Sequence, residues 1–317
     1  MNKSSLRKLP NLIIGGATRA GTTSLFTYLS WHPDICASTV KETNYFTPLL
    51  SNNRMQPVNR YYEYFKNCSD QSKYVMEATP IYLYGGKKIA EAIYKQLGHI
   101  KIIFLLRDPI QRFFSYYKQR KETRDIPANM HFDDYVNRTL ESFYERKDHG
   151  RGNSSEYIDV YAQDVYLENL AQGFYADYLV PWFNTFGDSV KVYFFRDLTK
   201  KPFQFMSRIC NWLNITPSIY QSKKFTIENK GLIYKNLWLH GIALTINDRF
   251  EKFLRNHFFL KNILRNIYFS MNELTDRRET ISRQALKKLE SVYKVYNKNL
   301  FNIMSSKGYF DFPKWVK

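Results

Sequence analysis

The sequence of 317 residues has few cysteines, glycines and prolines, and it has no long hydrophobic run. Its three cysteines are an odd number without C-x-x-C spacing, which excludes a disulfide scaffold and a cysteine-ligated zinc cluster. No stretch reaches the roughly 18 apolar residues of a membrane span, and the apolar run near the N-terminus is too short for a signal peptide. With 13 glycines and 11 prolines, collagen-like and low-complexity classes are also excluded. These absences indicate a soluble globular protein.

Acidic residues are scarce as well. The chain has 47 Lys+Arg against 29 Asp+Glu, a formal net charge of +18, and residues 1–33 contain no acidic residue. More than half of the excess lies in residues 221–317. Such a charge indicates nucleic acid, an anionic membrane surface or an anionic small molecule as partner, or else simply a solvated basic surface. Because the sequence has no repeat and no zinc-finger spacing, we do not expect nucleic acid, and a nucleic-acid-binding protein stays as an alternative only.

Four short apolar runs are typical of strands that are buried on both faces, at residues 12–14, 74–76, 101–106 and 190–195. Patterns with helical spacing alternate with these runs. Strands that alternate with helices predict an α/β fold, with a central parallel sheet flanked by helices. Since no Pro/Gly/Ser-rich linker interrupts the pattern, we expect a single domain over residues 8–317.

Helical patterns cover residues 22–31, 87–97, 109–120 and 156–185. Residues 121–155 are polar and charged, and they predict a loop-rich connection or a lid. Apolar side chains at helical spacing in residues 282–302 predict an amphipathic helix. That helix would belong to a helical C-terminal part, residues 236–317.

A glycine-rich turn follows the first predicted strand. Gly16 and Gly21 have the spacing of a P-loop, in which backbone N–H groups and a helix N-terminus bind phosphate. The position of the P-loop lysine is Thr22, and the cation stands inside the loop as Arg19. A nucleotide kinase or NTPase therefore lacks its main cation and stays as an alternative. A tight strand–helix turn without a ligand is the other interpretation.

A second pattern follows the third predicted strand. Arg107 comes directly after the strand, and Ser115 lies eight residues later in the predicted helix. The arginine fork and a hydroxyl suit phosphate oxygens. A structural ion pair between Arg107 and an acid such as Asp108 is an equally good interpretation of the arginine alone.

Together the motifs resemble the sulfotransferases that use 3′-phosphoadenosine 5′-phosphosulfate (PAPS), especially the bacterial and glycan-modifying members. Four segments carry the resemblance: RAGTTSL at residues 19–25, KETNYF at 41–46, MEATPIY at 76–82 and RDPIQRFFSYY at 107–117. Gly173, Tyr175, Leu179 and Trp182, then Lys230 and Gly231, follow in the family's order. The resemblance covers about residues 10–235. It implies a P-loop-like strand–loop–helix that binds phosphosulfate.

The resemblance also implies roles for individual residues. Glu42 would be the general base, Lys41 would act at the sulfuryl group, and Arg19 would stabilise the leaving phosphate. An ion pair of Glu42 that only orients Lys41 or Arg19 is the alternative. The implied product is adenosine 3′,5′-bisphosphate (PAP), and no metal is implied. The residues expected to bind PAPS are Arg19, Ala20, Gly21, Thr22, Thr23, Ser24, Arg107, Ser115, Lys230 and Gly231.

The acceptor is defined less closely. We expect a hydroxyl or amine of a glycan, glycolipid or small metabolite, with Glu77, Tyr82 and Arg196 as candidate acceptor contacts or as structural residues. Ala78 stands where glycosaminoglycan enzymes commonly carry lysine, which argues against a heparan-type acceptor.

The resemblance also bears on location. Animal glycan sulfotransferases usually have an N-terminal anchor, whereas this chain begins almost directly with its first strand, so we expect a cytoplasmic enzyme. Residues 249–269 are basic and apolar. They predict either contact with a membrane surface or the acceptor cleft, or an ordinary packed helix pair. The oligomeric state stays open.

Overall fold

The computed structural model describes residues 8–148, 164–225 and 279–317. A parallel sheet of five strands forms its centre, in the order β2-β3-β1-β4-β5. The predicted α/β class with a central parallel sheet is therefore confirmed. The strands are β1 (Leu12–Gly16), β2 (Ile35–Ala37), β3 (Tyr74–Ala78), β4 (Lys101–Leu106) and β5 (Val190–Phe194).

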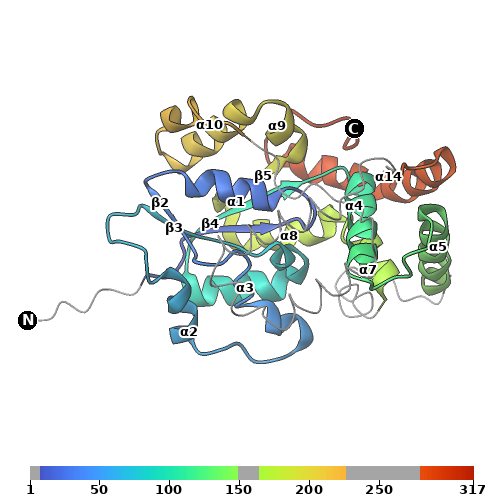
Figure 1. The fold of residues 1–317 in the computed structure, drawn as a ribbon, viewed down its shortest axis with the longest axis horizontal. Helices are drawn as coiled ribbons and strands as arrows, with labels where there is room; N and C mark the ends of the chain where they lie inside the picture. The colour runs from blue at the N-terminus through green and yellow to red at the C-terminus, as the bar shows by residue number, and fades with distance from the viewer. Residues whose placement is uncertain (1–7, 149–163, 226–278) are drawn as a thin grey trace, which may run out of the picture.

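Helices cover both faces of the sheet (Figure 1). Side chains alternate along each strand, so that Leu12 and Ile14 face one layer while Ile13 faces the other. The first layer contains α1 (Thr22–Ser30) and α10 (Pro202–Leu213). The opposite layer is formed by α3 (Gly86–Leu97), α4 (Pro109–Glu122), α5 (Phe132–Asp148), α7 (Val165–Ala171), α8 (Tyr175–Phe186) and α14 (Arg283–Ser306).

Short helical elements complete the connections between strands. They are η1 (Thr47–Ser51), α2 (Val58–Tyr62), η2 (Glu63–Phe65), η3 (Pro80–Gly85), η4 (Gly187–Ser189), α9 (Phe195–Lys200) and η5 (Pro217–Tyr220). None of the helices within the described ranges combines the length and apolar character needed to cross a membrane.

Most predicted elements have counterparts in the structure. The four predicted strands correspond to β1, β3, β4 and β5, and the predicted C-terminal helix is α14, whose buried face includes Leu289 and Val292. The prediction of a loop-rich connection at 121–155 is wrong for its central part, because α5 is a helix of 17 residues. Its buried face repeats at helical spacing, through Phe132, Tyr135, Val136, Thr139, Leu140 and Phe143.

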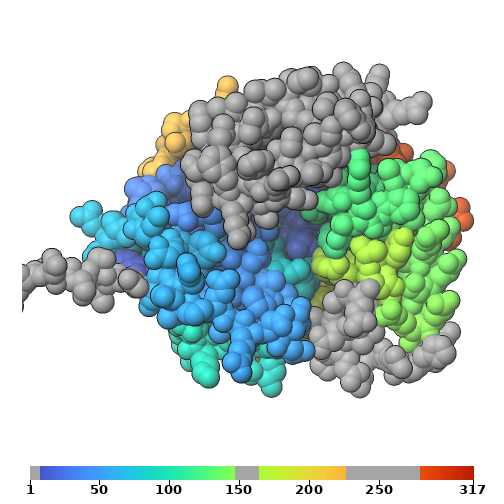
Figure 2. Space-filling model, turned by 60° about the horizontal axis from the view of Figure 1, so that its bottom comes forward, coloured from blue at the N-terminus to red at the C-terminus, as the bar shows by residue number. Residues whose placement is uncertain are grey.

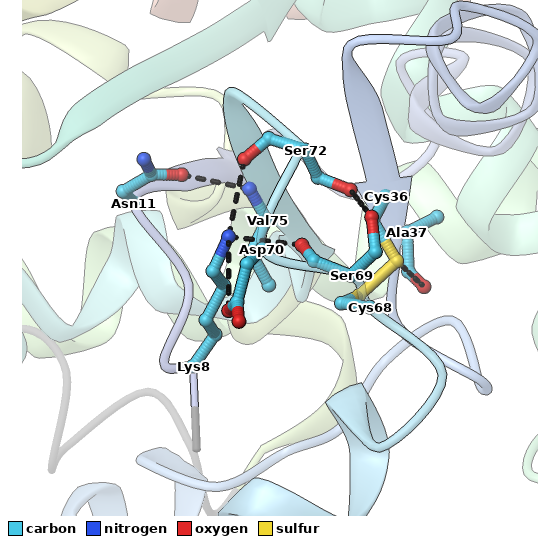
Figure 3. The surroundings of a disulfide bond; sticks show 9 residues. All are labelled: Lys8, Asn11, Cys36, Ala37, Cys68, Ser69, Asp70, Ser72 and Val75. Carbon is cyan, nitrogen blue, oxygen red and sulfur yellow. Dashed lines mark hydrogen bonds and ion pairs between the residues drawn. A yellow bond between two sulfur atoms is a disulfide. The ribbon is translucent and has the colours of Figure 1, made fainter. Parts of the chain in front are cut away.

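One disulfide joins Cys36 of β2 to Cys68, which lies 32 residues later (Figure 3). The Cα atoms of the pair are 5.5 Å apart. Counting cysteines in the sequence excluded a disulfide framework but missed this single bridge. Beside it, the Lys8 ammonium donates to the Ser69 carbonyl at 2.9 Å. The bridge closes a loop of the chain that includes Lys41 and Glu42.

Candidate phosphosulfate site and catalytic carboxylate

The glycine-rich turn connects β1 to α1 at the carboxyl end of the sheet. In parallel α/β sheets, this edge is where ligands bind. Gly21 caps α1 with a φ of +88°, and a Cβ atom there would lie 2.5 Å from the Phe195 ring. Only glycine fits that position without strain or collision. Ala20, Thr22 and Ser24 are buried, and Thr23 is partly exposed.

Arg19 and Arg107 meet at this turn. The Arg19 Nε donates to the Ser115 Oγ at 3.1 Å, and the Arg107 Nη1 donates to the Arg19 carbonyl at 3.0 Å. Arg107 also lies over the Phe195 ring, 5.0 Å from its centre. Thus β1, β4 and α4 bring together the three side chains that the sequence analysis assigned to phosphate binding.

Burial lowers the pKa of both arginines, although both stay charged. It is the main cause that lowers the pKa of Arg19 and the pKa of Arg107 below their usual values, and the charge of Arg19 lowers the pKa of Arg107 further. The described side-chain hydrogen bonds of the two groups go to a hydroxyl and a carbonyl rather than to carboxylates. A pair of half-buried cations whose described hydrogen bonds go to neutral oxygens fits an anionic ligand such as a phosphate.

Lys118 adds a third cation that sequence reasoning missed. It lies one helical turn after Ser115 on α4, and its Nζ is 4.7 Å from the centre of the Phe114 ring. Burial lowers the pKa of Lys118, and the charges of Arg107 and Arg19 act in the same direction. The i, i+3 spacing from Ser115 was the available signal.

Two buried polar side chains, Tyr84 and Gln172, form hydrogen bonds with Thr18 of the glycine-rich turn. The Thr18 Oγ1 donates to the Gln172 Oε1 at 2.7 Å, and the Thr18 N–H donates to the Tyr84 Oη at 3.2 Å. The fully buried Arg112 donates to the same Gln172 oxygen at 3.1 Å. Sequence reasoning did not identify Gln172 or Tyr84, because their contacts join segments far apart in the chain.

Lys41 and Glu42 follow β2 and form an ion pair with each other. The Glu42 side chain is about half exposed, whereas that of Lys41 is mostly covered. The Glu42 charge raises the pKa of Arg19, opposing the larger effect of burial, so the carboxylate lies within electrostatic range of the turn. The predicted orienting pair with Lys41 is therefore present, together with a carboxylate accessible to a ligand.

The three candidate acceptor contacts make structural contacts, as the alternative interpretation expected. Glu77 and Tyr82 are fully buried. Arg196 bonds Asp197 at 2.8 Å and Asp311 at 3.1 Å, and so ties the start of α9 to the C-terminal segment. Lys230, Gly231 and the segment 249–269 lie outside the described residues.

Figure 2 shows a hollow in one face of the molecule. The hollow opens between the blue N-terminal part of the chain and green residues of the α4 region, with dark blue atoms from the start of the chain on its floor. Among the residues that the structure describes, no group of three or more His, Cys, Asp or Glu side chains is arranged to hold a metal ion.

Comparison with known proteins decides the family. The family model described as "Sulfotransferase domain" matches residues 9–237. The chain belongs to the sulfotransferase family. A solved sulfotransferase from Alicyclobacillus acidocaldarius shares the fold, with a TM-score of 0.63 and 18% identity over 98% of this chain and 100% of that one.

Curated relatives are also sulfotransferases. The membrane-associated sulfotransferase kil1 of Dictyostelium discoideum is 36% identical over 34% of this chain and 22% of its own length. A bifunctional heparan sulfate N-deacetylase/N-sulfotransferase of Drosophila melanogaster is 22% identical over 98% of this chain and 27% of its own length. This sulfotransferase chain thus spans about a quarter of the length of these relatives.

Proposed function

We propose that the chain transfers a sulfuryl group from PAPS to a hydroxyl or amine of a carbohydrate acceptor. The observation that carries the proposal is the meeting of Arg19, Arg107 and Ser115 at the glycine-rich turn, with Glu42 in electrostatic range. When bound, PAPS supplies the sulfuryl group and an adenosine bisphosphate leaving group. The residues present fit that group, because they offer half-buried cations and a turn that is closed to any side chain at Gly21.

The donor nucleotide would be held at both phosphate ends. Arg19 and the N–H groups of residues 20–24 bind the 5′-phosphosulfate, since the helix N-terminus adds its partial positive charge. Arg107 and Ser115 bind the 3′-phosphate, which distinguishes this nucleotide from ATP. Lys118 adds charge on the same side. Lys230 and Gly231 stay expected ligands on the motif alone.

Proton transfer would fall to Glu42. Its half-exposed carboxylate accepts the proton of the acceptor hydroxyl, a contribution worth about 10²–10⁴ in rate for a positioned base. Before proton transfer, the ammonium of Lys41 is paired with the Glu42 carboxylate. Once Glu42 is protonated, the ammonium can stabilise negative charge on the sulfuryl group that is being transferred. Arg19 orients and neutralises the leaving phosphate.

A carbohydrate acceptor is supported by the names of the relatives, which include heparan sulfate N-sulfotransferases. Ala78, which the sequence resemblance places where glycosaminoglycan enzymes commonly carry lysine, is buried in the core. We therefore propose a glycan, with its polymer class left to experiment. A lipid-linked sugar and a small metabolite are the other outcomes of that test.

The disulfide changes the proposed location. A cytoplasmic enzyme was expected, but disulfides persist mainly in oxidising compartments. Since Cys36 and Cys68 are bridged, we propose that the enzyme works in such a compartment. Mass spectrometry of unreduced protein from its native cells tests this proposal. Free thiols at both positions would restore the cytoplasmic assignment.

Labelled PAPS provides the functional test. The enzyme is incubated with ³⁵S-PAPS and, in parallel, with N-acetylheparosan, de-N-sulfated heparin and a lipid-linked sugar extract. Label on the first indicates O-sulfation, and label on the second that is lost when its amines are N-acetylated indicates N-sulfation. Label in the third indicates a lipid-linked acceptor. If the protein binds PAP but labels none of these or a total cell extract, the proposed transfer is wrong.

A further inference from the structure

The segment that carries the catalytic carboxylate lies against the end of β3. The Glu42 N–H donates to the Ala78 carbonyl at 2.8 Å, and the Phe46 N–H donates to the Tyr82 Oη at 3.2 Å. Glu42 has a φ of +65° and Asn44 a φ of +54°. Both are left-handed conformations, which asparagine adopts readily but which are unfavourable for glutamate, so surrounding contacts must maintain that of Glu42.

Thr43 lies between these two residues in the sequence, and its side chain is held by a buried carboxylate. Its Oγ1 donates to the Oε2 of Glu77, a carboxylate with no exposed surface. The same carboxylate accepts the Tyr61 hydroxyl at 2.6 Å and the Thr79 hydroxyl at 3.2 Å. A buried carboxylate is stable only with such donors. One donor thus comes from the catalytic segment, and another comes from α2.

We propose that Glu77 is a positioning residue of the sulfuryl transfer, acting through Thr43 to hold Glu42 in the backbone conformation that places its carboxylate beside Lys41. The inference rests on the proposed role of Glu42 as base. The hydroxyl of Thr43 connects the buried carboxylate of Glu77 to the residue between the two left-handed residues, Glu42 and Asn44. Loss of that hydroxyl would release the segment without removing any group that touches the substrate.

Two matched variants separate positioning from a purely structural role. Thr43→Val and Tyr61→Phe each remove one hydroxyl that donates to Glu77, but only the first removes it from the catalytic segment. Both should lower Tm. We expect Thr43→Val to lower kcat for ³⁵S transfer to a total glycan extract at least tenfold, with the Kd for PAP within twofold of wild type. Tyr61→Phe should keep kcat within twofold, and Thr43→Ser should restore it.

The assays are run well below the Tm of every variant, so that unfolding does not contribute. A wild-type kcat in Thr43→Val, or equal losses of kcat in Thr43→Val and Tyr61→Phe, would overturn the positioning role. Glu42→Gln in the same assay keeps the two proposals apart. If Glu42→Gln is inactive while Thr43→Val is normal, only the positioning role fails. If Glu42→Gln has the kcat of the wild type, Glu42 is not the base, and the positioning role that rests on it fails as well.

Discussion

The Nε of Arg19 lies 3.1 Å from the Oγ of Ser115, although 96 residues separate them in the sequence. One comes from the turn after β1 and the other from α4, so the sheet brings together the groups proposed for the two phosphate ends of PAPS. If the proposed roles hold, this contact connects the residues for the 5′-phosphosulfate to those for the 3′-phosphate. The proposal then predicts that the site prefers a nucleotide with both phosphates.

The 3′-phosphate preference should depend on Arg107. Wild-type protein should bind PAP at least tenfold more tightly than AMP, because a charge-assisted hydrogen bond contributes about 1.5–3 kcal/mol. Arg107→Ala should remove most of that difference while leaving AMP binding nearly unchanged. Isothermal titration calorimetry measures both affinities. Arg208→Ala, which breaks a surface ion pair with Asp197, is the control. An undiminished preference in Arg107→Ala would place the 3′-phosphate elsewhere.

Gly21→Ala should abolish donor binding. The added Cβ would collide with the Phe195 ring beside the turn, and a φ of +88° is unfavourable for alanine by about 1–2 kcal/mol. Gly187→Ala is the matched control, since Gly187 has a φ of +53° but no atom within 4 Å of the added Cβ. Both variants should lose stability in thermal unfolding, but only Gly21→Ala should lose PAP binding. Equal PAP affinities would contradict the assigned site.

Reduction of the disulfide should destabilise the protein. The bridge closes a loop with a sequence separation of 32, for which chain entropy gives a stabilisation of about 3–4 kcal/mol. Cys36→Ser with Cys68→Ser should lower the free energy of unfolding by a similar amount in a urea titration. Reductant should then have no further effect on the double variant. A reductant effect that persists there would show that the bridge is not its target.

Thiol labelling checks the same assignment. Burial raises the pKa of the Cys210 thiol to about 12, so this cysteine should stay unreactive in the folded protein near pH 8. After mild reduction, iodoacetamide should modify Cys36 and Cys68 alone. Mass spectrometry of the alkylated peptides gives the answer. Fast labelling of Cys210 before reduction would contradict the packing of α10.

Glu42→Gln should keep donor binding and lose transfer. The amide cannot accept a proton at neutral pH, so kcat should fall by about 10²–10⁴, while the Kd for PAP stays within twofold. Glu91→Gln on α3 is a control, because its carboxylate lies on an exposed helix surface. Rates come from ³⁵S transfer under steady-state conditions with saturating PAPS. Turnover at the wild-type rate would leave Glu42 with only the role of orienting Lys41.

Much of the fold was predictable because buried parallel strands are continuous apolar runs. The short strand β2 was missed, since three residues give no periodicity. In α5, charged residues between Phe132 and Phe143 obscured a helical apolar repeat that is visible in the sequence. The pairing of Cys36 with Cys68 depends on distance in space, which the number of cysteines does not reveal.

Short motifs in the sequence pointed to Arg19 and Arg107, which the structure brings into contact, while their role in phosphate binding stays a prediction. The site was not predictable where a role depends on burial. Glu77 stands in one of the family's motifs, yet it is fully buried, and its donors Tyr61 and Thr43 come from other segments. The third cation, Lys118, was missed although its i, i+3 spacing from Ser115 is visible in the sequence.

Differential binding of nucleotides tests the central claim most directly, because it needs no knowledge of the acceptor. Thermal unfolding is followed with PAP, with Mg-ATP and with neither. The PAPS site predicts a clear rise in Tm with PAP, little change with Mg-ATP, and loss of the PAP effect in Arg107→Ala. Stabilisation by Mg-ATP without any effect of PAP would contradict the assignment and favour a P-loop kinase or NTPase.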